Sequence, residues 1–354
     1  MKNSRTATVT QLHEFDEIID VRTPAEFAED HVPGAINCPV LSNEERVIVG
    51  TLYKQESAFA AKKVGAALIA RRIAEHLELE FANKPREWRP LIYCWRGGNR
   101  SGAMTHILNQ VGWRASILDG GYKSYRRHVR EELAELPIKF KYQVVSGSTG
   151  SGKSRLLEAL ASQGAQVLDL ESLASHKGSV LGGLPDMPQP SQKMFDTVLA
   201  ERLQQLDPNQ VVFIEAESRK IGSVQVPDAL LDLIRTSPCL KIQATIQERV
   251  KFLLEDYVYF LQDPESLKNK LTFLRELQSS ETLTYWDSLI DQGAWEILVA
   301  ELLEKHYDAL YSRSQDKNYE RFKDAPTYLA DDLSPKGLKK LAIEILSKIP
   351  PLEL

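Results

Sequence analysis

The chain has 354 residues, of which 43% are hydrophobic and 26% charged, as is typical of folded globular proteins without long disordered segments. Its length favours two domains, each large enough to bury a core of its own. The net charge of −5 argues against bulk electrostatic binding of nucleic acid, although it is compatible with a local basic face.

The sequence predicts no signal peptide and no membrane-spanning segment. The first ten residues are polar, and no run approaches the roughly 18 apolar residues that a membrane span needs. We therefore expect a cytoplasmic protein with no membrane partner. The three cysteines, Cys38, Cys94 and Cys239, lie far apart and form no CxxC pair, so neither a disulfide framework nor a zinc ribbon is expected.

The first third of the chain alternates short apolar strands with helical segments. Strands are predicted at residues 17–21, 91–93 and 115–119, and helices at residues 58–79 and 101–111. This alternation is typical of a parallel α/β sheet. A polar helix at residues 122–136 follows, and we interpret residues 122–139 as a linker after a first domain of residues 1–121.

From residue 140 onward the same alternation begins again. Strands are predicted at residues 141–145, 166–170, 211–215 and 239–246, with a helix at residues 153–162. After Glu248 the pattern is almost purely helical and ends in an amphipathic segment at residues 335–349. The predicted fold is therefore α/β with two parallel-sheet domains, the second (residues 140–354) carrying a helical C-terminal extension.

A candidate nucleophile lies between a predicted strand and a predicted helix. Cys94 opens the segment Cys-Trp-Arg-Gly-Gly-Asn-Arg-Ser, whose glycines let backbone N–H groups approach the sulfur. The helix N-terminus and the charges of Arg96 and Arg100 favour the thiolate, which is the reactive form of cysteine. We predict that these three residues are catalytic.

This segment resembles the loop in which the rhodanese family carries its persulfide. The resemblance extends to Asp-Val-Arg-Thr-Pro-Ala-Glu-Phe at residues 20–27 and His-Val-Pro-Gly-Ala-Ile-Asn at residues 31–37. The Cys-x5-Arg spacing also occurs in phosphatases that share this fold. A phosphatase would need a general acid, and the loop contains no Asp or Glu.

A complete GxxxxGK[ST] motif follows the first strand of the second domain and opens a helix, which is the context of a phosphate-binding loop. Its residues are Gly147, Ser148, Thr149, Gly150, Ser151, Gly152, Lys153 and Ser154. Backbone N–H groups would surround phosphate oxygens, Lys153 would add a positive charge, and Ser154 could bind Mg²⁺.

Polar residues at the ends of two later strands are candidates for an outer layer of this site. Glu215 and Glu217 follow the strand at residues 211–215, where many phosphate-loop enzymes bind magnesium through an acidic residue. Glu171, His176 and Lys177 lie in a polar loop after the preceding strand. Strand ends of this kind are where parallel sheets bind ligands.

Nearly the whole chain resembles the bacterial tRNA 2-selenouridine synthase family, which joins these two modules. The resemblance is carried by the cysteine loop at residues 94–102 and by segments at residues 49–55, 168–179, 215–222 and 306–308. Lys177 stands where members of the family often have Arg, a change that keeps the charge but loses the planar fork.

The resemblance implies a transferase that converts 2-thiouridine at the wobble position of tRNA to 2-selenouridine. The thio group would first be geranylated from geranyl diphosphate, and selenium from selenophosphate would then replace the S-geranyl group, with Cys94 as selenium carrier. It implies no tightly bound cofactor, with Mg²⁺ as a candidate ion, and contact with the anticodon region and with a selenophosphate-producing enzyme.

A tRNA-binding face would have to be local, because the whole chain is acidic. Basic side chains gather on the predicted helix at residues 122–136, with Tyr122 and Tyr125 as candidates for base stacking. The basic candidates are Lys123, Arg126, Arg127 and Arg130. A solvated linker face is an equally good interpretation of this pattern.

Two other functions are compatible with the motifs. The chain could be an ATP-dependent kinase-like enzyme with an accessory sulfur-transfer domain, or a sulfur carrier that relays persulfide to a partner. The first should transfer a nucleotide γ-phosphate, and the second should survive loss of Lys153. The sequence leaves open which tRNAs are used, whether the phosphate loop binds geranyl diphosphate or a nucleotide, and whether sulfur or selenium is the donor atom.

Overall fold

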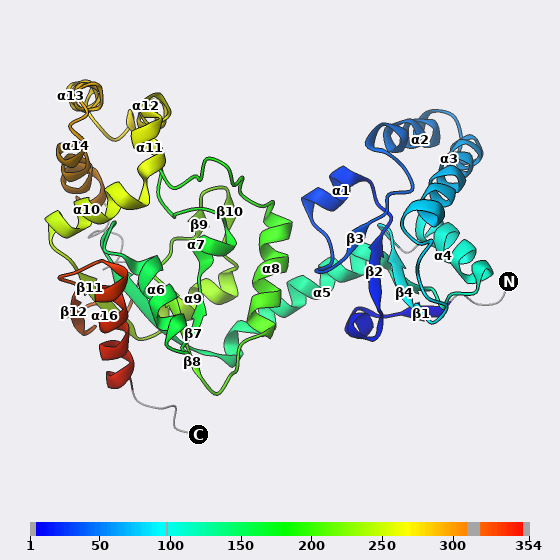
Figure 1. Ribbon diagram of the computed structural model, residues 1–354, viewed down its shortest axis with the longest axis horizontal. Helices are drawn as coiled ribbons and strands as arrows, with labels where there is room; N and C mark the ends of the chain where they lie inside the picture. Colours follow the sequence, from blue (N-terminus) through cyan, green and yellow to red (C-terminus); the bar gives the residue numbers. More distant parts are fainter. Residues whose placement is uncertain (1–4, 97, 310–318, 350–354) are drawn as a thin grey trace. The chain divides into compact units, whose positions relative to one another are not determined.

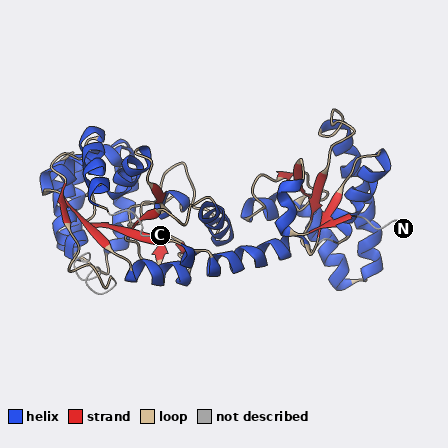
Figure 2. Cartoon of the chain, turned by 90° about the horizontal axis from the view of Figure 1, so that it is seen from below, coloured by secondary structure: helices blue, strands red, loops and turns tan. Residues whose placement is uncertain are grey.

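The computed structural model describes residues 5–96, 98–309 and 319–349. The chain divides into two compact units (Figure 1). Unit 1 comprises Met1–Glu132 and Asp196–Val198, and unit 2 comprises Leu133–Phe195 and Leu199–Leu354. The division falls within helix α5 (Gly121–Glu135), in the part of the chain that the sequence marks as a linker. In each unit the strands are flanked by helices (Figure 2).

Unit 1 contains a five-stranded, entirely parallel sheet with the strand order β1-β5-β4-β2-β3. The strands are β1 (Arg5–Ala7), β2 (Glu17–Asp20), β3 (Ile36–Asn37), β4 (Pro90–Tyr93) and β5 (Ser116–Leu118). The helical elements are η1 (Val9–Glu14), α1 (Pro24–Glu29), α2 (Asn43–Gln55), α3 (Ala58–Leu79), α4 (Asn99–Val111) and the first part of α5.

The long helix α3 begins where the sequence predicts. The Ser57 side chain accepts a hydrogen bond from the Ala60 N–H, which satisfies one of the free donors of the first turn. Helix α3 packs against α2 and α4. The core of the unit joins strand residues such as Ile19 and Ile92 to Met104 on α4. These contacts fix α4, and with it the end of the cysteine loop.

Unit 2 contains a second five-stranded parallel sheet, in the order β12-β11-β6-β8-β7, and a separate antiparallel pair of strands, β9 and β10. Its strands are β6 (Lys141–Gly147), β7 (Gln166–Leu168), β8 (Val211–Glu215), β9 (Lys220–Ile221), β10 (Val224–Gln225), β11 (Cys239–Gln243) and β12 (Thr327–Leu329). Around the sheets lie η2 (Pro137–Lys139), α6 (Lys153–Ser162), α7 (Leu170–Leu173), α8 (Gln192–Gln204), α9 (Asp228–Thr236) and α16 (Pro335–Lys348).

The C-terminal extension forms a helical layer with a core of its own, which includes Phe260, Trp286 and Leu298. Its elements are α10 (Ile246–Asp256), α11 (Val258–Gln262), α12 (Pro264–Leu271), η3 (Thr272–Leu274), α13 (Ser280–Asp291), α14 (Trp295–Leu302) and η4 (Leu303–Tyr307). Helix α14 packs against α10 and α13. Within the described ranges, no helix is both long and apolar enough to cross a membrane.

The parallel α/β fold is as predicted, but some boundaries differ. The predicted strands at residues 166–170 and 239–246 are too long, because Asp169 and Thr245 act as N-caps that begin α7 and α10. The region after Glu248 is not purely helical, since β12 pairs with β11 at the edge of the sheet. This strand has three residues, too few for a periodic pattern.

Candidate functional site

Cys94 lies directly after β4, at the carboxyl edge of the sheet in unit 1, and its side chain is buried. The Gly98 N–H and the Ser101 hydroxyl donate to its sulfur, each with a donor–Sγ distance of 3.3 Å. Burial would raise the pKa of the thiol, but the hydrogen bonds from Ser101 and from the Arg96 backbone, together with the charge of Arg100, lower it on balance. This is the environment predicted for a thiolate nucleophile.

The other two cysteines behave as buried apolar side chains. Burial raises the pKa of Cys38 to about 12 and that of Cys239 to about 11. The sequence predicts a reactive thiol only at Cys94. The pKa of Cys94 is lowered whereas the pKa values of Cys38 and Cys239 are raised, which is consistent with that prediction.

The two arginines of the loop are placed differently. Arg96 is exposed, whereas the Arg100 guanidinium is held by both carboxylate oxygens of Glu26 on α1, with N–O distances of 2.7 and 3.2 Å. Burial opposes ionisation of Glu26, but the bonds from Arg100 outweigh it and lower the pKa of this carboxyl to about 2. Arg100 therefore acts on Cys94 by its charge and holds the loop against α1. Gly97 lies outside the described residues.

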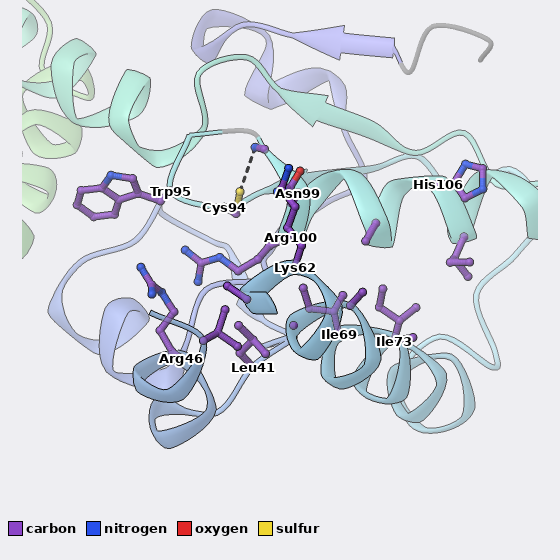
Figure 3. A pocket seen from close by; sticks show the side chains of 18 of the residues that line it. Leu41, Arg46, Lys62, Ile69, Ile73, Cys94, Trp95, Asn99, Arg100 and His106 are labelled. Atoms are coloured by element: carbon purple, nitrogen blue, oxygen red, sulfur yellow. Dashed lines mark hydrogen bonds between the residues drawn. The ribbon is translucent and has the colours of Figure 1, made fainter. Parts of the chain in front are cut away.

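Cys94 opens onto a cavity of about 1080 Å³ between α3 and α4 (Figure 3). One wall is the apolar face of α3 and includes Ile69 and Ile73. The cationic residues that line it are Arg46, Lys62, Arg96 and Arg100. The sequence analysis missed Arg46 and Lys62, because they precede the cysteine by more than 30 positions and belong to no local motif.

A buried polar network lies next to the cysteine loop and is bonded to it. Arg22 forms an ion pair with Asp20 at 2.6 Å, and its guanidinium lies 3.8 Å from the centre of the Tyr122 ring. The Tyr122 hydroxyl donates to Asp30 at 2.7 Å, and its backbone N–H donates to the Cys94 carbonyl at 2.8 Å. The first turn of α5 is therefore attached to the cysteine loop.

These contacts correct part of the tRNA-binding prediction. Tyr122 and Tyr125 are 1% and 6% exposed, so neither offers a ring for base stacking. Arg126 is largely buried and lies 3.6 Å from the Asp30 carboxylate. The other three basic candidates, Lys123, Arg127 and Arg130, are exposed.

The phosphate loop joins β6 to α6, as its motif predicts. Gly150 and Gly152 have φ angles of 78° and 77°, a conformation that residues with a Cβ adopt only at a cost. The Lys153 ammonium donates to the Gly147 carbonyl at 3.0 Å, within the loop itself. The Ser154 hydroxyl donates to Glu171 at 3.1 Å, which connects the loop to the acidic residues beside it.

Glu171, Glu215 and Glu217 come together beside the loop, with one carboxylate oxygen of each within 4.8 Å of the others. Burial raises the pKa of all three, and repulsion from Glu171 adds to this for Glu215 and for Glu217, whose pKa rises to about 8. Glu215 is fully buried, and one of its oxygens has no hydrogen-bond partner among the described residues. With the Ser154 hydroxyl, these oxygens are a donor set that fits Mg²⁺.

His176 and Lys177 line the same cavity, which has a volume of about 700 Å³. Burial lowers the pKa of His176, so its ring is neutral at pH 7. The Lys177 ammonium donates to the carboxylate and to the backbone carbonyl of Asp256, both at 2.6 Å, and lies 4.3 Å from the centre of the Tyr257 ring. Lys177 therefore ties this loop to α10.

Arg249 has a role that the sequence analysis missed. Its Nε donates to the Thr149 carbonyl of the phosphate loop at 2.9 Å, and its two terminal nitrogens bind Asp308 at 2.9 and 2.7 Å. The Arg249 side chain is only 7% exposed, whereas the Asp308 side chain is 34% exposed, so the ion pair lies at the edge of the buried region. Arg249 thus joins the phosphate loop to the end of the helical extension.

Both units are similar to known protein domains. Residues 6–128 match the rhodanese-like domain, and residues 140–280 match the AAA domain of tRNA 2-selenouridine synthase. Both matches agree with the predicted succession of folds.

Three relatives are each named tRNA 2-selenouridine synthase. The protein from Nitrosomonas europaea is 36% identical over 252 residues, which are 68% of this chain and 63% of that one. The protein from Hydrogenovibrio crunogenus is 33% identical over 73% of each chain. That from Sulfurovum sp. is 28% identical over 86% of this chain and 90% of its own. The match with the Nitrosomonas protein thus spans slightly less than two thirds of its length.

Proposed function

Because the chain belongs to the tRNA 2-selenouridine synthase family, we propose that it is a transferase that converts 2-thiouridine at the wobble position of tRNA to 2-selenouridine. The reaction has two steps. In the first, the thio sulfur attacks the first carbon of geranyl diphosphate, an S–C bond forms, and diphosphate leaves. In the second, the selenium of selenophosphate attacks carbon 2 of the base, geranylthiol leaves with the sulfur, and water then takes the phosphoryl group from selenium as phosphate.

The observation that carries this proposal is the Cys94 site. A buried thiol with a lowered pKa opens onto a cavity that has both an apolar wall and several cationic side chains. A prenylated nucleotide has matching parts: a hydrocarbon group for the apolar wall and phosphates for the cations. A phosphatase would not need the long apolar wall of α3. We therefore assign the second step to Cys94.

The first step belongs to the phosphate loop. Diphosphate is a leaving group on which negative charge develops, and N–H groups, a lysine and a divalent cation stabilise that charge. Lys153 and the Ser154 hydroxyl supply the first contacts, while Glu171, Glu215 and Glu217 would hold Mg²⁺. Bound Mg²⁺ would neutralise the diphosphate oxygens as they leave.

Binding of the tRNA backbone falls to the exposed cations of α5. Lys123, Arg127 and Arg130 are exposed on the helix whose first turn is bonded to the cysteine loop, where the Lys123 N–H donates to the Trp95 carbonyl at 3.0 Å. Trp95 is 38% exposed beside Cys94, so it replaces the buried tyrosines as the aromatic side chain available to a base.

The test is mass spectrometry of wobble nucleosides from cells whose chromosomal copy of this gene is deleted and which carry either the wild-type gene or a variant on a plasmid. The wild-type copy should restore 2-selenouridine, and Cys94→Ser should abolish it while geranylated 2-thiouridine accumulates. Cys239→Ser is the matched control, because this thiol is equally buried but has a raised pKa. Unchanged selenouridine with Cys94→Ser would refute the assignment of the second step.

A further inference from the structure

The phosphate-loop cavity adjoins a second, apolar pocket inside the helical extension. The pocket has a volume of about 70 Å³ and lies among α10, α11 and α14. Five of its lining residues also line the phosphate-loop cavity: Thr149, Ser179, Leu253, Tyr257 and Tyr307. Thr149 belongs to the phosphate loop itself, so a ligand whose phosphates occupy the loop can extend directly into the pocket.

The polar groups of this pocket are concentrated where it meets the loop. Its remaining lining residues are Val299, Phe260, Trp295 and several leucines. The indole N–H of Trp295 is the single polar side-chain group among them. A nucleobase needs hydrogen-bond partners for its edge, and burying it without them is costly. A hydrocarbon chain has no such requirement. The walls therefore favour an apolar group joined to a phosphate.

The volume sets the size of that group. A water molecule needs roughly 10–15 Å³ by the same measure, so 70 Å³ holds about five heavy atoms. One isoprene unit contains five carbons. By the same measure, the larger cavity at the loop, about 700 Å³, has ample room for the diphosphate and a first isoprene unit, so the narrow apolar pocket is the part that limits the chain.

We propose that this pocket binds the terminal isoprene unit of the prenyl diphosphate donor and so selects a ten-carbon chain. The inference rests on the proposed function, because it takes a prenyl diphosphate as the ligand of the phosphate loop. A five-carbon chain is too short to fill the pocket, and a fifteen-carbon chain exceeds it. Val299 and Leu298 on α14, with Leu254 on α10, are the residues that set this limit.

The connection through Arg249 supports the same picture. Arg249 joins the Thr149 carbonyl to Asp308, which directly follows η4, and η4 contributes Leu303 and Tyr307 to the pocket. The phosphate loop and the apolar walls are therefore held in a fixed relation. A donor is bound only when its diphosphate and its chain end fit together.

The experiment introduces a large side chain on α14 that fills the pocket, in the full-length protein. Val299 is half-buried and lines the pocket, so Val299→Trp should occupy the space of the terminal isoprene unit. Ile297→Trp is the matched control, because Ile297 lies on the same helix, is 53% exposed and does not line the pocket. Titration calorimetry with Mg²⁺ present gives the affinities for inorganic, dimethylallyl, geranyl and farnesyl diphosphate.

Each buried methylene contributes about fourfold in affinity, so the wild type should prefer geranyl to dimethylallyl diphosphate by at least about 100-fold. Val299→Trp should reduce this ratio by about 10- to 100-fold and leave the affinity for inorganic diphosphate within about twofold. Ile297→Trp should leave the ratio unchanged. Val299→Ala enlarges the pocket and should raise the affinity for farnesyl relative to geranyl diphosphate.

The ratio of affinities separates the outcomes, because damage to the whole fold would weaken every diphosphate alike. An unchanged geranyl-to-dimethylallyl ratio in Val299→Trp and no gain for farnesyl in Val299→Ala would overturn the inference. Tighter binding of ATP than of geranyl diphosphate, lost in Val299→Trp, would also overturn it, since the pocket would then hold a nucleobase. If the wild type uses geranyl diphosphate but neither variant changes the ratio, the inference fails while the proposed function stands.

Discussion

Removing the Ser101 hydroxyl should make Cys94 a weaker acid. This hydroxyl donates to the sulfur at 3.3 Å, and the Gly98 carbonyl lies at the same distance, so one proton serves two acceptors. A hydrogen bond to a charged group is worth roughly 1.5–3 kcal/mol, and the sharing places this one at the low end. Since about 1.4 kcal/mol corresponds to one pKa unit, Ser101→Ala should raise the pKa of the thiol by about one unit.

The assay is the pH dependence of alkylation by iodoacetamide, which reacts with the thiolate. Well below the wild-type pKa the variant should react about tenfold more slowly than the wild type, and the two rates should converge as the pH rises above both pKa values. Cys38 and Cys239 contribute little, because their pKa values are raised to about 12 and 11, and Cys94→Ser supplies the blank. Thr105→Val is the control, since it removes another buried hydroxyl from the same helix. An equal alkylation profile for Ser101→Ala and wild type would refute the reasoning.

Three further outcomes are expected. Arg127→Glu with Arg130→Glu should weaken tRNA binding by at least about tenfold and flatten its salt dependence, measured by filter binding, because fewer counterions are released; equal salt slopes would contradict it. Lys153→Ala should lose geranyl transfer, because it removes an interaction worth roughly 3–4 kcal/mol in the transition state. The same variant should still convert a geranylated tRNA with selenophosphate and without ATP, since that step belongs to Cys94. A requirement for ATP would argue for kinase-like chemistry. Arg249→Met should lower the melting temperature and weaken inorganic diphosphate binding, because it removes both the hydrogen bond to the Thr149 carbonyl and the ion pair with Asp308; unchanged affinity would show that this contact does not position the phosphate loop.

The two motifs could be recognised from sequence because each is built from consecutive residues. A strand, a glycine-rich turn and a helix N-terminus fix the positions of their own N–H groups, so Cys94 and Lys153 lie where the local pattern predicts. Glu215 and Glu217 could be predicted for a related reason, since parallel strands end at the same edge of a sheet.

Contacts between distant segments could not be predicted in this way. Arg249 meets Thr149 across 100 positions, and Arg46 reaches the cavity of Cys94 only because α2 packs against α3. The short strand β12 is identified by its pairing with β11 rather than by its own three residues.

For α5 the signal was present, but its tyrosines were interpreted as partners for base stacking and its basic residues as one binding face. Tyr122, Tyr125, Val129 and Leu133 recur at helical spacing and form the buried face, and Arg126 shares it. Reading the helix by its apolar period would have assigned the tyrosines to the core. The remaining basic residues would then have been left as the outer surface.

The attachment of α5 to the cysteine loop has a consequence for how a large substrate could be aligned. The N–H groups of Tyr122 and Lys123 are bonded to the carbonyls of Cys94 and Trp95, and Arg127 and Arg130 lie within two turns of these anchors. An α-helix advances 1.5 Å per residue and is stiff over this length, so seven residues from Lys123 to Arg130 span about 10 Å. The helix therefore sets a distance: a nucleic-acid backbone bound to its cations would lie at a fixed distance from the Cys94 sulfur, with no hinge between the cations and the sulfur.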